Sequence, residues 1–180
     1  MNINDLVDKL RKDFPDLSFA ARTQAYWSPR DKHIFYKLAP KTDTAIWTLF
    51  HELGHALLKH DSYMTDIDLL RKEVAAWSKA EELAIAYGFT FNDFYVQKCL
   101  ETYRNWIYKR STCPRCDARG TQNQEKEYVC LNCGAHWSVS TSRFCRPYRG
   151  SNRHRNSQTT TKSQEIHPWL FVENMSPKSD

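Results

Sequence analysis

The spacing of hydrophobic positions divides the first 110 residues into helical segments and one stretch rich in aromatic and β-branched residues. Apolar residues recur three and four positions apart in four segments, which is the spacing of amphipathic helices. Between the first two segments, apolar runs at residues 25–27 and 33–36 flank a Ser-Pro-Arg-Asp turn and predict a β-hairpin. The pattern therefore predicts an α+β fold with a short antiparallel sheet. The predicted helices cover about residues 4–14, 42–60, 65–88 and 92–110.

The chain changes character at Ser111, where cysteines replace the helical pattern. A small cysteine-rich module is expected at residues 111–148, after a larger domain formed by residues 1–110. The tail at residues 149–180 is mostly polar and basic, and its composition is typical of disorder. An apolar island at residues 168–172 interrupts this tail and is expected to dock on a partner or on the chain itself.

The hydrophobic runs and the cysteine content indicate the cellular compartment of the protein. No apolar run approaches the ~20 residues that a membrane-spanning helix needs, and polar residues interrupt the N-terminus where a signal peptide would be apolar. We therefore expect a soluble, cytoplasmic protein with no membrane partner. In a reducing compartment, six cysteines favour metal binding over disulfides. Cys99 and Cys145 lie outside the paired cysteines and are expected to be ordinary thiols.

The second predicted helix carries a His-Glu-x-x-His motif, formed by His51, Glu52 and His55. Positions i and i+4 lie on one face of a helix, so both imidazoles can reach a single metal ion. Glu52 directly follows the first histidine and can take a proton from a metal-bound water. The motif also occurs by chance, in helices whose surface histidines have no function. Its place within a strongly amphipathic helix favours the metal site.

Three residues after the motif are candidates for a third ligand: His60, Asp61 and Glu73. If the helix continues to residue 60, His60 lies about 180° around it from His51 and faces away. Asp61 has the spacing of the third ligand in some zinc peptidases, but Leu58 stands where those enzymes break the helix with glycine. Glu73 lies on the next helix beside small residues that permit close packing; a surface ion pair is its alternative role. We predict that Glu73 completes a His₂Glu site whose fourth position is open to water.

Residues 47–60 read Trp-Thr-Leu-Phe-His-Glu-Leu-Gly-His-Ala-Leu-Leu-Lys-His, which resembles the active helix of the ImmA/IrrE-type metallopeptidases. The resemblance covers about residues 1–90 and implies a zincin-like fold. It also implies a zinc-dependent endopeptidase in which Glu52 activates a zinc-bound water. The implied substrate is a protein, often a DNA-binding repressor.

In that family the following helix supplies a glutamate ligand, usually within a Glu-x-Glu-Ala-(Asp/Asn) pattern. Here Glu73 and Ala76 match the first glutamate and the alanine. Ala75 and Trp77 replace the second glutamate and the Asp/Asn residue. These departures concern the hydrogen bond that usually orients a histidine ligand, and they leave the three ligands and the base in place.

A second metal constellation lies in the cysteine-rich module. Two Cys-x-x-Cys pairs are separated by thirteen residues, a spacing that fits a tetrahedral Cys₄ zinc site. Short runs before and after the second pair predict the strands of a zinc ribbon. A four-sulfur site is closed, so this zinc is expected to be structural, with a redox pair as the alternative. The predicted ligands are Cys113, Cys116, Cys130 and Cys133.

Basic residues are concentrated late in the chain. Residues 141–163 hold six basic residues and no acidic ones. A ribbon beside such a stretch is a candidate for contact with nucleic acid, with Trp137 or Tyr148 able to stack on bases. A solvated tail, and a core position for Trp137, are the alternatives.

Three functions are consistent with these patterns. The first is an endopeptidase with one catalytic and one structural zinc, whose ribbon and basic tail recruit it to a substrate or to DNA. The second is similar to SprT-type proteases, which act on DNA-bound proteins but take a third histidine after the motif that has no well-placed counterpart here. The third is a non-catalytic DNA-binding or regulatory protein that keeps the peptidase fold as a scaffold. The third predicts one zinc per chain, whereas the first predicts two.

Overall fold

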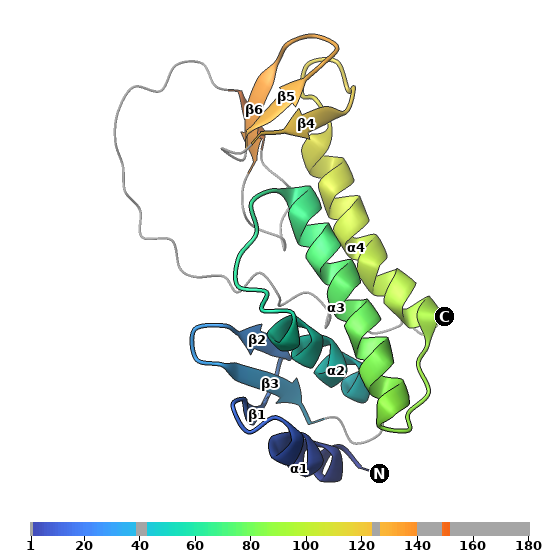
Figure 1. The fold of residues 1–180 in the computed structure, drawn as a ribbon. Coiled ribbons are helices and arrows are strands. Elements are labelled where there is room, and N and C mark those ends of the chain that lie inside the picture. Colours follow the sequence, from blue (N-terminus) through green and yellow to red (C-terminus); the bar gives the residue numbers. More distant parts are fainter. Residues whose placement is uncertain (1, 39–42, 124–126, 140–148, 152–180) are drawn as a thin grey trace. The chain divides into compact units, whose positions relative to one another are not determined.

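The computed structural model describes residues 2–38, 43–123, 127–139 and 149–151 (Figure 1). Within these residues it has four helices and two small sheets, which confirms the predicted α+β class. The helices are α1 (Ile3–Asp13), α2 (Asp43–Leu57), α3 (Asp66–Ala86) and α4 (Asp93–Ser111). The strands are β1 (Ser18–Arg22), β2 (Tyr26–Ser28), β3 (His33–Lys37), β4 (Gly120–Gln122), β5 (Tyr128–Cys130), β6 (His136–Val139) and β7 (Arg149–Ser151).

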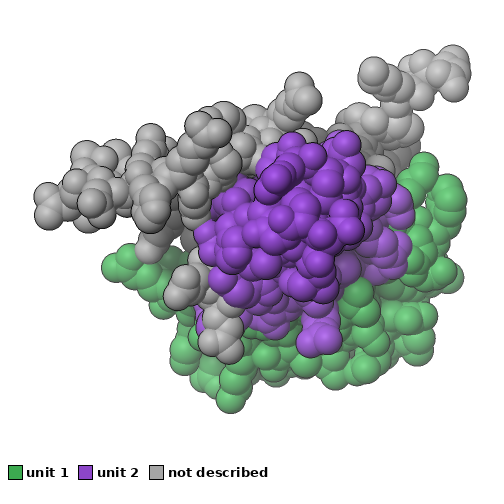
Figure 2. All heavy atoms as spheres, turned by 90° about the horizontal axis from the view of Figure 1, so that it is seen from above, with its two compact units in different colours: residues 1–61, 72–99, 165–180 green, residues 62–71, 100–164 purple. Residues whose placement is uncertain are grey.

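The described chain forms two compact units, which Figure 2 colours separately. The helices α3 and α4 each contribute residues to both units, and the second unit contains the predicted ribbon. The predicted domain boundary between residues 110 and 111 stays a prediction. The first unit comprises residues 2–38, 43–61 and 72–99, and the second comprises residues 62–71, 100–123, 127–139 and 149–151.

Helix α1 begins with a reciprocal capping box. The side chain of Asn2 accepts hydrogen bonds from the backbone N–H groups of Asn4 and Asp5, and the Asp5 carboxylate accepts from the Asn2 N–H. These bonds satisfy donors that a helix start otherwise leaves open. The apolar face predicted from the spacing is the face that is buried, through Leu6, Val7 and Leu10.

The first sheet has the order β1-β3-β2 and is mixed in direction. β2 and β3 pair antiparallel with Trp27 opposite Ile34, which confirms the predicted hairpin. β1 pairs with β3 in parallel, with Phe19 opposite Ile34, so the predicted short antiparallel sheet gains a parallel third strand. The alternation of apolar residues indicates that a strand exists but not which way its neighbour runs. In Figure 1 the sheet lies between α1 on one side and α2 on the other.

Helix α2 is buried on almost every face, since each residue from Trp47 to Ala56 is buried. Such burial is typical of a helix at the centre of its unit. The indole N–H of Trp47 donates to the carbonyl of Thr90 at 2.8 Å. The polar residues of the His-Glu-x-x-His motif therefore lie inside the unit and not on its surface.

The starts of α3 and α4 and the end of α3 carry capping residues, at the limits of the predicted ranges 65–88 and 92–110. Thr65 Oγ1 accepts from the Asp68 N–H at 3.2 Å, and Asn92 Oδ1 accepts from the Tyr95 N–H at 3.1 Å. Gly88 follows α3 with a φ of +78°, a left-handed conformation that glycine adopts without strain. The predicted starts and the glycine stop of these helices are confirmed.

The second sheet has the order β4-β5-β6-β7. Its core is the stacked pair of Tyr128 and Trp137, whose ring centroids are 5.5 Å apart. β7, at the start of the tail that the sequence predicts to be disordered, pairs antiparallel with β6. Pairing with a strand edge uses backbone groups alone, so polar side chains do not prevent it.

The rest of the tail, including the apolar island at residues 168–172, lies outside the described residues. The same holds for Cys145, for Tyr148 and for most of the basic stretch at residues 141–163. No helix in the described part of the chain is both long enough and apolar enough to span a bilayer.

Candidate metal centres

The first candidate centre depends on a close approach of α2 to α3 at Gly54 and Ala76. A Cβ atom at Gly54 would lie 2.6 Å from the backbone oxygen of Ala76, which is closer than carbon and oxygen can approach. Ala76 is itself 0% exposed, so no large side chain separates the helices. The expectation that small residues near Glu73 permit close packing is confirmed. Since Glu73 is one turn before Ala76, this contact brings its carboxylate to the histidines of α2.

The side chains of His51, His55 and Glu73 meet inside the first unit. The Nε2 atom of His51 lies 3.1 Å from Nε2 of His55 and 3.3 Å from one carboxylate oxygen of Glu73. The other Glu73 oxygen lies 3.7 Å from Nε2 of His55. All three side chains are 0% exposed. Among the described residues they form one of two groups that could hold a metal ion, and Asp61, the alternative ligand, belongs to neither.

The separations within this cluster fit a tetrahedral ion. Ligand atoms about 2.0–2.1 Å from a zinc ion lie about 3.3–3.4 Å apart at the corners of a tetrahedron. The two imidazole nitrogens are 3.1 Å apart, and the distances of 3.3 and 3.7 Å run to the two different oxygens of the Glu73 carboxylate; all three lie close to that value. Two imidazoles and one carboxylate are also a donor set of catalytic zinc sites, in which the fourth position stays open. The residues present therefore fit zinc.

Burial and mutual attraction set the charges of His55 and Glu73. Burial, together with repulsion from His51, lowers the pKa of His55 from 6.5 to about 4. Burial alone would raise the pKa of Glu73, but attraction to His55 and contacts with both histidines outweigh it and hold that pKa well below its usual range. At neutral pH, His55 is therefore a neutral imidazole and Glu73 a carboxylate, which are the forms that bind a metal.

Trp77 stands where the family pattern has Asp or Asn, and its ring stacks on the ring of His51. The ring centroids are 4.1 Å apart and the planes differ by 25°. Trp77 is 2% exposed, and Nδ1 of His51 is buried without a hydrogen-bond partner in the described part of the chain. An aromatic face therefore orients His51 in place of the hydrogen bond that the resemblance implies.

His60 turns back toward His55, so the prediction that it faces away is wrong. Helix α2 ends at Leu57, earlier than predicted, and Lys59 adopts a left-handed φ of 55°. The N–H of His60 donates to the His55 carbonyl at 3.0 Å, and the N–H of Lys59 donates to the Ala56 carbonyl at 3.1 Å. These two bonds form a Schellman ending. The turn places Nδ1 of His60 2.8 Å from Nδ1 of His55.

Glu52, the predicted base, lies on α2 between the two histidines and is 0% exposed. At 100° per residue it stands about 100° from His51 and about 60° from His55 around the helix. It therefore shares the half of α2 that carries the two histidines.

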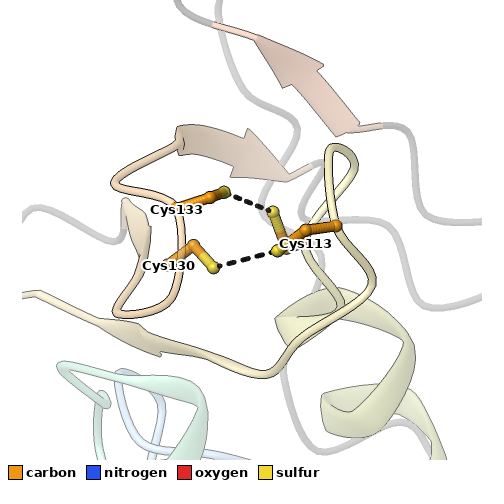
Figure 3. Close-up of side chains that lie close together, drawn as sticks. Cys113, Cys130 and Cys133 are labelled. Carbon is orange, nitrogen blue, oxygen red and sulfur yellow. Dashed lines mark hydrogen bonds between the residues drawn. The ribbon is translucent and has the colours of Figure 1, made fainter.

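The second candidate centre brings together the four predicted cysteines. Figure 3 labels three of them, Cys113, Cys130 and Cys133, whose sulfur atoms point toward one another. The Sγ atoms of Cys113 and Cys133 are 3.7 Å apart, and those of Cys116 and Cys130 are 3.5 Å apart. Sulfurs about 2.3 Å from a zinc ion lie about 3.8 Å apart in a tetrahedron, so the set fits zinc. All four are free thiols, since a disulfide would need about 2.05 Å. Cys99 lies outside both groups, and burial raises its pKa to about 11.

Hydrogen bonds favour the thiolate form of one of these four cysteines. The side-chain amide of Asn132, with help from the backbone of Ala118, lowers the pKa of Cys116 to about 6. A backbone hydrogen bond from Ala135 favours the thiolate of Cys133, but burial and the neighbouring thiols outweigh it and raise the pKa of Cys133 to about 12. Cys116 therefore loses its proton more readily than Cys133, and the thiolate is the form that binds a metal.

A buried ion pair that the sequence did not indicate ties the ribbon to the helical residues of the second unit. Nε of Arg110, at the end of α4, lies 2.5 Å from a carboxylate oxygen of Asp66, at the start of α3. The hydroxyl of Tyr128 donates to the same carboxylate at 2.6 Å. The indole N–H of Trp137 donates to the Arg110 carbonyl at 3.0 Å. Trp137 is 0% exposed, so it is a core residue and is not available to stack on bases.

The described residues of the ribbon carry nearly balanced charges. Residues 113–123, 127–139 and 149–151 hold three arginines against one aspartate and one glutamate. Four thiolates around a divalent ion would add two negative charges. Contact of the ribbon and of the basic stretch at residues 141–163 with nucleic acid stays a prediction.

No family model, curated protein or solved structure matches this chain. The resemblance to the ImmA/IrrE-type metallopeptidases stays a prediction, carried by the residues around His51 and Glu73.

Proposed function

We propose that this chain is a zinc-dependent endopeptidase with a zincin-like, ImmA/IrrE-like domain that cleaves a protein substrate. The observation that carries the proposal is the convergence of His51, His55 and Glu73 at separations that fit a tetrahedral ion. These residues hold the catalytic zinc in the proposal, and the four cysteines hold a structural one. The position of Glu52 directly after the first histidine adds the base that peptide hydrolysis needs.

Each residue of the first centre has a distinct role in the proposed peptide hydrolysis. His51, His55 and Glu73 would hold the ion. When bound, zinc supplies a Lewis acid that polarises the scissile carbonyl and makes water more acidic. Glu52 accepts a proton from the attacking water on a carboxylate oxygen and passes it to the leaving amine nitrogen. A base in this role contributes about 10²- to 10⁴-fold to the rate.

The burial of the first centre favours a second candidate function. His51, Glu52, His55 and Glu73 are each 0% exposed, so a peptide reaches them only after the unit opens. A closed site is typical of structural zinc, whereas a catalytic site keeps one position open. The second candidate is therefore a non-catalytic regulatory protein that keeps the peptidase fold as a scaffold.

A SprT-like protease receives less support. It needs a third histidine as a ligand, and His60 meets His55 through the two Nδ1 atoms. The Nε2 atom of His55 is on the opposite side of the ring and faces Glu73. The carboxylate of Glu73 thus occupies the place that a third histidine would take.

Cleavage assays on the zinc-loaded full chain test the proposal. The substrates are denatured casein and a library of quenched fluorescent peptides, and wild type is compared with Glu52→Gln. We expect wild type to cleave and Glu52→Gln to lose about 10²- to 10⁴-fold of the rate while retaining both metals. Glu81→Gln, the same change at an exposed position of α3, is the matched control and keeps full activity. Undiminished cleavage by Glu52→Gln contradicts the mechanism, and no cleavage by wild type with both metals bound selects the non-catalytic candidate.

A further inference from the structure

We propose that His60 is a positioning residue of the first metal centre, which fixes the ring of His55 by accepting a hydrogen bond from it. The inference rests on the metal site proposed above, formed by His51, His55 and Glu73. It assigns a role to a histidine that the sequence pattern placed on the far side of the helix.

The orientation of His55 determines the direction of this hydrogen bond. Its Nε2 atom faces Nε2 of His51 at 3.1 Å and Glu73 at 3.7 Å, so Nε2 is the nitrogen that would bind a metal. A neutral imidazole that offers Nε2 as a ligand carries its proton on Nδ1. Nδ1 of His55 lies 2.8 Å from Nδ1 of His60, so His55 donates and His60 accepts. His60 then carries its own proton on Nε2.

The backbone of His60 is held on both sides, so its ring does not swing freely. Its N–H donates to the His55 carbonyl at 3.0 Å. Its carbonyl accepts from the indole N–H of Trp27 at 3.0 Å, and Trp27 is a buried residue of β2. His60 is 8% exposed. The turn after α2 is thereby tied both to the helix and to the first sheet, and the imidazole is presented to His55 in a fixed place.

The two histidine ligands are oriented by different means. His51 stacks on Trp77 and makes no hydrogen bond through Nδ1 within the described residues, whereas Nδ1 of His55 meets His60. A hydrogen-bond partner behind a ligand histidine holds the ring and makes it a better donor to the metal, and its loss typically costs about 10- to 100-fold in metal affinity. The effect should therefore appear when the acceptor at residue 60 is removed.

Two substitutions separate the acceptor from the bulk of the ring. His60→Phe keeps an aromatic ring without an acceptor, and His60→Asn places an amide oxygen close to the position of Nδ1. His136→Phe, at a half-exposed histidine of the ribbon, is the matched control. Zn²⁺ affinity is measured on the full chain by competition with a chromophoric chelator at neutral pH. Co²⁺ spectra then distinguish the two sites, because only the Cys₄ site gives thiolate charge-transfer bands.

We expect His60→Phe to weaken Zn²⁺ binding at the His₂Glu site about 10- to 100-fold and to alter its Co²⁺ bands, while the Cys₄ site is unchanged. His60→Asn should recover most of the lost affinity, and His136→Phe should bind both ions as wild type does. Wild-type affinity in His60→Phe, or equal losses in His60→Phe and His60→Asn, would overturn the role of His60. A wild-type chain that binds Zn²⁺ only at the Cys₄ site would instead overturn the proposed function.

If His60→Phe does not fold, ¹⁵N NMR of the zinc-loaded wild-type chain tests the role of His60 instead. The proposal requires a proton on Nδ1 of His55 and a nitrogen–nitrogen coupling across the hydrogen bond to Nδ1 of His60. A His55 ring protonated on Nε2, or a protonated Nδ1 with no coupling to His60, would contradict it.

Discussion

Gly54 and Ala76 bring the backbones of α2 and α3 into direct contact, because a Cβ atom at Gly54 would lie 2.6 Å from the Ala76 oxygen. The contact lies one residue before His55 and one helical turn after Glu73. The geometry of the first metal centre therefore depends on a residue that is neither a ligand nor a base.

Gly54→Ala should disrupt the first centre. The added methyl group must push the two helices apart, which costs about 1–3 kcal/mol and moves Glu73 away from the histidines. Gly88→Ala is the matched control: it strains a left-handed position by about 1–2 kcal/mol, but no atom lies within 4 Å of its Cβ. We expect Gly54→Ala to lose Zn²⁺ from the His₂Glu site and Gly88→Ala to keep it, as measured by metal analysis after dialysis. Equal retention in both variants would show that the contact does not position Glu73.

Trp77 should contribute to metal binding through its stacked contact with His51. An aromatic pair contributes about 0.5–1.5 kcal/mol beyond the area that it buries, which corresponds to a loss of up to about tenfold in affinity. We expect Trp77→Leu to weaken Zn²⁺ binding at the His₂Glu site and Trp77→Phe, which keeps a ring face, to weaken it less. Chelator competition measures both. Equal affinities in the two variants would mean that the stacking is not what orients His51.

The buried His55 should make the metal-free protein less stable in mild acid. Its pKa is lowered from 6.5 to about 4, so between these values the unfolded chain binds a proton that the folded chain does not. The free energy of unfolding therefore falls as the pH drops from 6.5 toward 4, and the lowered pKa of Glu73 acts in the same direction below about 4.5.

Urea denaturation of chelator-treated protein at several pH values measures this dependence. The control is His55→Gln, which should flatten the slope between pH 5 and 6.5. An identical slope in both proteins would remove His55 as its cause.

The hydroxyl of Tyr128 should stabilise the buried ion pair of Asp66 and Arg110. Tyr128→Phe removes a hydrogen bond to a charged acceptor and should cost about 1.5–3 kcal/mol of unfolding free energy. If the hydroxyl acts through Asp66, the loss should shrink when Asp66 is already Asn, as a double-mutant cycle in urea measures. Additive losses would show that the two groups are not coupled.

The sequence predicts the helices and both candidate metal groups because local patterns of residues specify them. Periodicity and capping residues such as Thr65, Asn92 and Gly88 locate the helices. The i, i+4 histidines share a helix face, and small residues around Glu73 mark the packing that joins the helices.

The sequence did not predict features that depend on residues far apart in the chain or on backbone contacts alone. Lys59 follows α2 in a left-handed conformation, without the glycine that usually signals such a helix ending. The helical spacing therefore predicts His60 on the wrong side of α2. The parallel partner of β1 depends on backbone contacts that side-chain patterns do not encode. The role of Trp77 required knowing which ring lies against it.

The zinc content per chain shows whether Glu73 completes a metal site with His51 and His55. Purified wild type, Glu73→Ala and the surface control Glu81→Ala are compared by elemental analysis. We expect two zinc ions per chain in wild type and in Glu81→Ala, and a number close to one in Glu73→Ala. Two zinc ions retained in Glu73→Ala, or only one in wild type, would contradict it.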